Sequence, residues 1–139
     1  MRVLSIDYGE ARVGIAITDA LNITAQGLET IKRNGSDKVI LRRLDELLKQ
    51  YEVGTIVVGM PLNMNGTQSL RATKTQEFIH KLKCKYNKIK IETIDERLTT
   101  VEAHKTMNFL DINKNKKKEI VDTISAVYIL ETYINKNHK

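Results

Sequence analysis

The start of the chain constrains the fold more than any other segment. Residues 2–7 form an apolar, alternating run that ends on Asp7, and Gly9 separates it from a second alternating run at 12–18. Two such runs joined by a few residues that include a glycine predict a tight β-hairpin. The hairpin would hold the Asp7 carboxylate at the end of a rigid element, a position that suits a metal ion or a phosphate better than a core.

The rest of the chain alternates between strand and helix patterns. Further strands are expected at 23–31, 55–60 and 89–95, and helices at 36–51, 66–86, 100–109 and 119–134. Three meander strands followed by alternating helices and strands predict an α/β protein with one five-stranded mixed sheet and helices on both faces. This element order is that of the ribonuclease H-like fold. At 139 residues, we expect a single domain over 1–139.

Helical spacing also predicts which side chains face the core. They are Ile40, Leu41, Leu44, Leu47, Leu48 and Tyr51 in the first helix and Leu70, Phe78, Ile79, Leu82 and Tyr86 in the second. Ser36 is expected to cap the first helix. The last helix is apolar over most of its circumference, and Ser125 and Ala126, which share a face with Asp122, are small enough to let it approach the sheet closely.

The composition of the chain indicates which kinds of binding partner and which cellular compartment to expect. The net charge is +6 and the pI about 9.4, which favours an acidic partner, most often nucleic acid, although many small basic proteins bind nothing acidic. Cys84 is the only cysteine, so no intrachain disulfide can form, as in a reducing compartment. The apolar run 56–62 is too short to span a bilayer, and we expect no signal peptide, because the first strand begins almost at Met1. We therefore expect a soluble cytoplasmic protein with no membrane partner.

Three acidic positions lie on scaffold elements. Asp7 ends the first strand, Asp95 and Glu96 follow the last strand, and Asp122 lies in an apolar helix. Carboxylates are the ligands that Mg²⁺ and Mn²⁺ prefer, and two such ions can activate water and stabilise the leaving oxygen of a phosphodiester. Together, the acids indicate a divalent-metal site on a basic protein.

Each acid also has an ordinary structural interpretation. Asp7 fits a turn-capping role before a hairpin glycine. Asp95 and Glu96 fit a surface ion pair that precedes a capping box at the start of the next helix. Asp122 fits a first-turn position favoured by the helix dipole.

Several basic and loop residues suit a phosphate backbone. Arg12, Arg97 and residues 63–67, which include Asn63, are placed to contact substrate. The whole loop 59–67 leads into a helix N-terminus, whose backbone N–H groups can meet a phosphate. The lysines at 114 and 116–118 are expected in a loop before the last helix, either on phosphates or simply solvated. The three histidines and Cys84 show no zinc-ligand spacing.

These motifs resemble the YqgF family, also described as RuvX-like. Residues 6–9 and 12–16 are similar to its opening signature, 56–67 to its second block, and 95–103 to its third. The Asp122 helix, preceded by lysines, matches the fourth block. The resemblance covers essentially the whole chain, in order.

The resemblance implies a ribonuclease H-like nuclease that matures the 5′ end of the 16S ribosomal RNA precursor. An older suggestion for the family is Holliday junction resolution. By resemblance, Asp7, Glu96 and Asp122 are the metal-binding, catalytic acids, with Asp95 as the alternative second acid. Related resolvases often carry a fourth acid where this chain has Ser125.

The sequence thus predicts a Mg²⁺- or Mn²⁺-dependent nuclease acting on structured precursor ribosomal RNA, with ribosomal particles as a further partner. Asp7 would bridge the metals, and a metal-activated water would attack the phosphodiester. The alternatives are a junction resolvase, which needs a homodimer rather than a monomer, an actin-like phosphotransferase, and a non-catalytic RNA-binding ribosome assembly factor.

Overall fold

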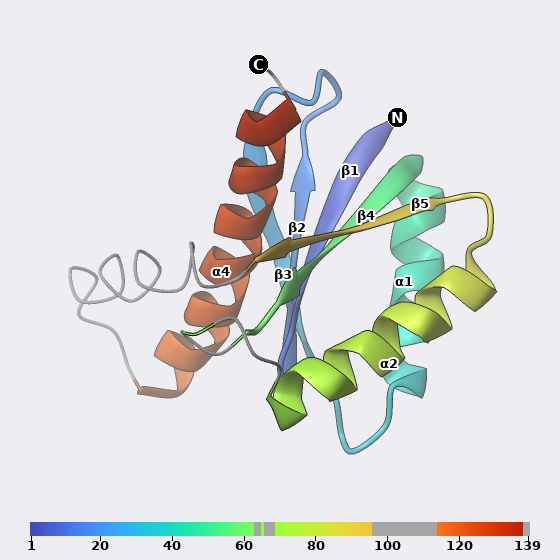
Figure 1. Cartoon of the computed structure of the whole chain (residues 1–139). Helices are drawn as coiled ribbons and strands as arrows, with labels where there is room; N and C mark the ends of the chain where they lie inside the picture. Colours follow the sequence, from blue (N-terminus) through green and yellow to red (C-terminus); the bar gives the residue numbers. More distant parts are fainter. Residues whose placement is uncertain (63–64, 66–68, 96–113, 138–139) are drawn as a thin grey trace.

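The computed structural model describes residues 1–62, 65, 69–95 and 114–137, with the side chains of the last range described from 121 (Figure 1). Its elements are β1 (Arg2–Tyr8), β2 (Arg12–Thr18), β3 (Ala25–Lys32), α1 (Lys38–Gln50), β4 (Val53–Met60), α2 (Leu70–Lys85), β5 (Lys90–Asp95) and α4 (Lys114–Asn137). The predicted helix at 100–109 lies outside the described residues. Among the described helices, none is long and apolar enough to cross a membrane.

The strands form one mixed sheet in the order β3-β2-β1-β4-β5. Strand β2 pairs antiparallel with β1 and β3, whereas β1, β4 and β5 run parallel. The predicted hairpin and the five-stranded mixed sheet are confirmed. Parallel strands end at the same edge, so the carboxyl ends of β1, β4 and β5 lie together, where ligands of α/β sheets usually bind.

Helices cover both faces of the sheet (Figure 1), with α1 and α2 on one face and α4 on the other. Successive side chains of a strand point to opposite faces. On β1, Leu4, Ile6 and Tyr8 therefore join the core under α1 and α2, while Ser5 and Asp7 face α4.

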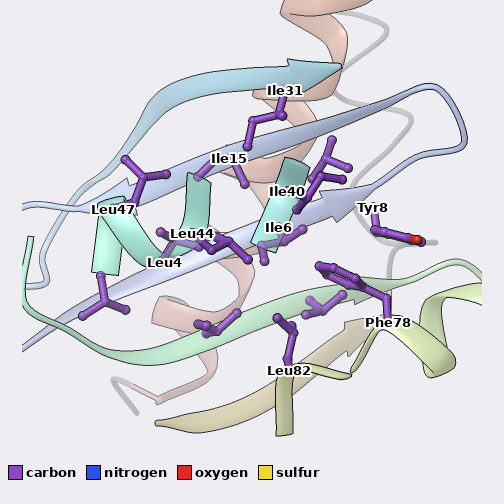
Figure 2. Packing of buried hydrophobic residues seen from close by; sticks show 14 of the residues in the cluster. Leu4, Ile6, Tyr8, Ile15, Ile31, Ile40, Leu44, Leu47, Phe78 and Leu82 are labelled. Atoms are coloured by element: carbon purple, nitrogen blue, oxygen red, sulfur yellow. The ribbon is translucent and has the colours of Figure 1, made fainter. Parts of the chain in front are cut away.

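The main core lies between the sheet and the helix pair α1 and α2 (Figure 2). Its fully buried members include Leu4, Ile6, Ile15, Ile40, Leu44, Leu47, Phe78 and Leu82. The Tyr8 ring stacks on Phe78 with 4.2 Å between ring centroids. The predicted inward positions of α1 and most of those of α2 are confirmed.

Two predictions for α2, its start and the burial of Leu70, are wrong. The helix begins at Leu70 rather than at 66, because Ser69 is its N-cap and accepts a hydrogen bond from the Ala72 backbone N–H at 3.2 Å. Leu70 is 73% exposed, contrary to the prediction that it faces inward. The buried stripe of α2 starts only at Ala72 and continues through Thr75.

The starts of α1 and α4 also differ from prediction. Asp37, not Ser36, is the N-cap of α1, although the Ser36 hydroxyl accepts a hydrogen bond from the Lys38 N–H at 3.2 Å. Helix α4 begins at Lys114, so the lysines at 114 and 116–118 lie in helical backbone rather than in a loop. Lysine is a good helix former, and neither glycine nor proline interrupts the segment.

Small residues line the contact between α4 and the sheet. Ser125 and Ala126 are buried, and the Ser5 hydroxyl donates a 2.6 Å hydrogen bond to the Ala126 carbonyl. A Cβ atom placed on Gly14 would lie 2.0 Å from the Asp122 carbonyl oxygen. The prediction that α4 approaches the sheet closely around Asp122 is confirmed.

Candidate active site

Asp7 lies at the end of β1 with its carboxylate toward α4, and the residue is only 5% exposed. A buried carboxylate is costly unless a cation or hydrogen bonds compensate it. An Arg71 Nη2 atom from the first turn of α2 lies 3.6 Å from Asp7 Oδ1. The β1 backbone thus fixes Asp7, and a guanidinium from another element lies against it.

The turn after Asp7 requires a glycine. The Gly9 N–H donates to the Arg12 carbonyl at 3.0 Å, which closes the β1–β2 turn. A Cβ atom on Gly9 would lie 2.4 Å from that same carbonyl oxygen. This close backbone approach fixes the start of β2 and hence the position of Arg12.

Asp122 projects from α4 toward the same turn. Arg12 Nε donates a 2.8 Å hydrogen bond to Asp122 Oδ2, and both side chains are about three-quarters or more buried, with 27% and 20% exposed. The helix begins at Lys114, about two turns earlier. Asp122 is therefore not a first-turn residue, and the helix-dipole interpretation does not explain it.

The sheet register brings Asp7 and Asp122 to one place. Asp7 is paired across the β1–β2 ladder with Gly14, and Gly14 is the residue that lies directly under the Asp122 backbone. A cavity of about 330 Å³ opens beside them, lined by Gly9, Glu10, Ala11, Arg12, Arg71 and Asp122. The predicted acid Asp122 and the predicted substrate residue Arg12 therefore line one cavity, together with Arg71, whose guanidinium lies against Asp7.

Asp95 lies on the opposite face of the sheet from Asp7. It ends β5 in register with Met60, and both Met60 and Ile91 pack on the α1 and α2 side of the sheet. Its neighbour Ile94 packs against Ile129 of α4 instead. By strand alternation, Asp95 points away from the face of Asp7. Glu96, Arg97 and Asn63 lie outside the described residues.

The donor chemistry of the site fits a hard divalent cation. Asp7 and Asp122 offer carboxylate oxygens, which Mg²⁺ and Mn²⁺ prefer. Within the described ranges no three His, Cys, Asp or Glu side chains gather closely enough to hold a metal. The described part of the site therefore offers two carboxylates, Asp7 and Asp122, and each is paired with an arginine.

Arg71 is the site residue that the sequence did not reveal. The only signal was an arginine in the first turn of a helix that follows a strand and a loop. Its ion pair with Asp7 depends on how α2 lies across the sheet edge, which periodicity does not specify.

A polar network around Asp37 supports the end of β1 from the other face of the sheet. The Tyr8 hydroxyl donates to Asp37 Oδ1 at 2.5 Å, Arg33 Nε donates to the same oxygen at 3.0 Å, and Lys81 Nζ donates to Oδ2 at 2.9 Å. Burial and the bond to Asp37 raise the pKa of Tyr8. Burial alone would raise the pKa of Asp37, but the hydrogen bonds from Tyr8 and Lys81 outweigh it and lower that pKa. The residue next to Asp7 is thus anchored to both helices.

Comparison with known sequences identifies the family. Over residues 1–136, the chain matches the family described as "RuvX: Holliday junction resolvase". The chain belongs to the RuvX family. The family predicted from the sequence motifs is therefore confirmed.

Two relatives of this RuvX chain share about half of its residues. A protein of Ruminiclostridium cellulolyticum is 52% identical over 136 residues, which are 98% of this chain and 95% of that protein. A protein of Acetivibrio thermocellus is 50% identical over 139 residues, which are 100% of this chain and 99% of that protein. Both carry the name "Putative pre-16S rRNA nuclease".

Solved structures confirm the ribonuclease H-like fold of this RuvX protein. T. thermophilus RuvC in complex with a Holliday junction substrate superposes with a TM-score of 0.60 at 12% identity, over 99% of this chain and 97% of RuvC. The Holliday junction resolvase of fowlpox virus gives 0.58 at 14% identity, over 98% and 99% of the two chains. At such identities, the likeness concerns the fold alone.

Proposed function

We propose that this RuvX protein is a metal-dependent nuclease that hydrolyses RNA phosphodiesters. The observation that carries the proposal is that Asp7 and Asp122, from opposite ends of the chain, come together at the carboxyl edge of the sheet, each beside an arginine that lines one cavity. An acidic pair among cationic side chains suits both a divalent metal and a phosphate.

Asp7 and Asp122, together with Glu96, would hold Mg²⁺ or Mn²⁺, which supplies activation of water and stabilisation of the leaving oxygen. The protein's own part is to position these groups. Strand β1 fixes Asp7, the Ser5–Ala126 hydrogen bond fixes α4 against it, and Arg12 orients the substrate phosphate. Arg97 and Asn63 are proposed as further substrate contacts.

The proposed substrate is the 16S ribosomal RNA precursor at its 5′ end. The names of the relatives that are 50% and 52% identical support it, and the net charge of +6 suits an RNA partner. We place the reaction in the cytoplasm, as a step of ribosome biogenesis on ribosomal particles, and assign it to a single domain over 1–139.

DNA junction resolution is the second candidate, because the family description names it. It requires two symmetric cuts and hence two sites in a homodimer.

Both candidates can be tested in one assay. The purified protein is incubated with end-labelled precursor ribosomal RNA and with a four-way DNA junction, each with Mg²⁺, with Mn²⁺ and with chelator. We expect cleavage of the RNA only when metal is present. Cleavage of the junction alone would favour the resolvase, and binding of RNA without any cleavage would favour an assembly factor.

A further inference from the structure

Arg71 links α2 to the candidate active site. One of its Nη atoms lies 3.6 Å from Asp7 Oδ1, and its side chain is 49% exposed while that of Asp7 is 7% exposed. It also lines the cavity together with Arg12 and Asp122. One end of the Arg71 side chain therefore contacts a buried acid, and the rest faces the space that substrate would occupy.

The position of α2 does not depend on this contact. The helix buries Phe78 and Leu82 completely, and further along it Lys81 pairs with Asp37 at 2.9 Å and Lys85 with Asp45 at 3.0 Å. The ion pair of Arg71 with Asp7 is longer than either. Arg71 can therefore exchange its partner while the helix stays in place.

A metal ion on Asp7 and a guanidinium on Asp7 compete, because both carry positive charge and both interact with the same carboxylate. The proposed function, on which this inference rests, puts a dication there. A displaced Arg71 would still lie at the cavity beside Arg12, and a guanidinium is well suited to bind phosphate oxygens with two parallel hydrogen bonds.

We propose that Arg71 is the counter-ion of Asp7 in the metal-free protein and a substrate-phosphate contact in the metal-bound protein. Metal binding thus releases the side chain that then binds the nucleic acid, so the two binding events are coupled through one residue.

The first test measures metal affinity without nucleic acid. In calorimetric titrations with Mn²⁺, we expect Arg71→Ala to bind roughly threefold more tightly than wild type, the size of effect that partly exposed ion pairs have. Lys83→Ala removes one positive charge from an exposed position on the same helix and should leave the affinity unchanged. Arg71→Gln serves as a second variant should Arg71→Ala fail to fold.

The second test measures how RNA binding depends on salt. A precursor ribosomal RNA fragment is titrated with Ca²⁺ present and with chelator, and its integrity is checked on a gel. With Ca²⁺, the plot of log affinity against log salt should be less steep for Arg71→Ala than for wild type. The difference in slope should be about the amount that one phosphate contact contributes. With chelator, where Arg71 pairs with Asp7, the two slopes should agree. Arg71→Lys should restore the slope with Ca²⁺.

Two results would overturn the proposal. One is an unchanged or weaker Mn²⁺ affinity in both Arg71 variants, and the other is a slope difference that is the same with and without Ca²⁺. Either could occur while the wild-type protein cleaves RNA, so the nuclease assignment would stand. A wild type that binds Mn²⁺ and never cleaves would refute the nuclease, but the Mn²⁺ titration would still decide whether Arg71 competes for Asp7.

Discussion

At Gly14 the backbone of α4 comes very close to the sheet. A Cβ atom there would lie 2.0 Å from the Asp122 carbonyl oxygen and 3.1 Å from the Thr123 nitrogen. These obstacles are backbone atoms, so no side-chain rotation can relieve the overlap. The same glycine is the ladder partner of Asp7. One small residue therefore sets the separation of the two acids.

Replacing this glycine tests that role. We expect Gly14→Ala to lower the free energy of unfolding by about 3 kcal/mol, because α4 must move away from the sheet. Urea unfolding measures the loss. Gly54→Ala is the matched control, since its Cβ would meet only the flexible Met1 side chain, with the Met1 sulfur at 2.8 Å. Equal stabilities of the two variants would contradict the close-packing account.

At the scale of elements, the network around Asp37 ties β1, α1 and α2 together. The pKa of Asp37 is lowered in the folded protein, because the hydrogen bonds from Tyr8 and Lys81 outweigh the effect of burial. A group with a lowered folded pKa stabilises the fold above its ordinary pKa, and this contribution is lost as the pH falls through the lowered value.

Asp37→Asn should therefore destabilise the protein by about 2 kcal/mol at neutral pH. Its deficit relative to wild type should shrink as the pH falls below about 4, where the Asp37 carboxyl of the unfolded wild-type chain begins to protonate, and should vanish below the lowered pKa of the folded protein. Urea unfolding at pH 7 and near pH 3 measures both values. Glu77→Gln, an exposed charge change on α2, should show no such dependence. A deficit for Asp37→Asn that is constant with pH would refute the linkage.

Some elements were easier to predict from sequence than others. Alternation identified the β1–β2 hairpin, and helical spacing identified the inward face of α1, because both patterns are set by burial. The start of α2 was placed too early because Ser69, not a residue near 66, caps it. The start of α4 was placed too late because a run of lysines was interpreted as a loop, although lysine favours helix.

The candidate site, like the elements, was predicted from the sequence only in part. Asp7 and Asp122 were predicted as site residues because a charge at a strand end and a charge in an apolar helix conflict with simple burial. Arg12 was predicted as a substrate contact, but its pairing with Asp122 was not predicted, and Arg71 was not predicted at the site at all. The Arg71–Asp7 and Arg12–Asp122 contacts arise only when helices and sheet are packed.

At the scale of the whole molecule, the topology assembles the site. Parallel β1, β4 and β5 end at one edge, and α4 returns across the opposite face from α1 and α2 (Figure 1). This arrangement brings the first strand and the last described helix together, so residues from both ends of the chain share one cavity. Element order predicted one mixed sheet with helices on both faces, because few connections satisfy the rules for such a sheet.

The central claim is that this assembled set of acids cleaves RNA with metal, and Asp7→Asn tests it most directly. The substitution keeps the size of the side chain and removes its charge. We expect cleavage of precursor ribosomal RNA in Mg²⁺ or Mn²⁺ to fall about 10³-fold or more, because a metal ligand is lost. Circular dichroism should remain that of wild type, and Asp45→Asn, a charge removal on α1, should cleave normally. Wild-type cleavage by folded Asp7→Asn protein would contradict the account, and a variant that does not fold would make Asp7 a structural residue.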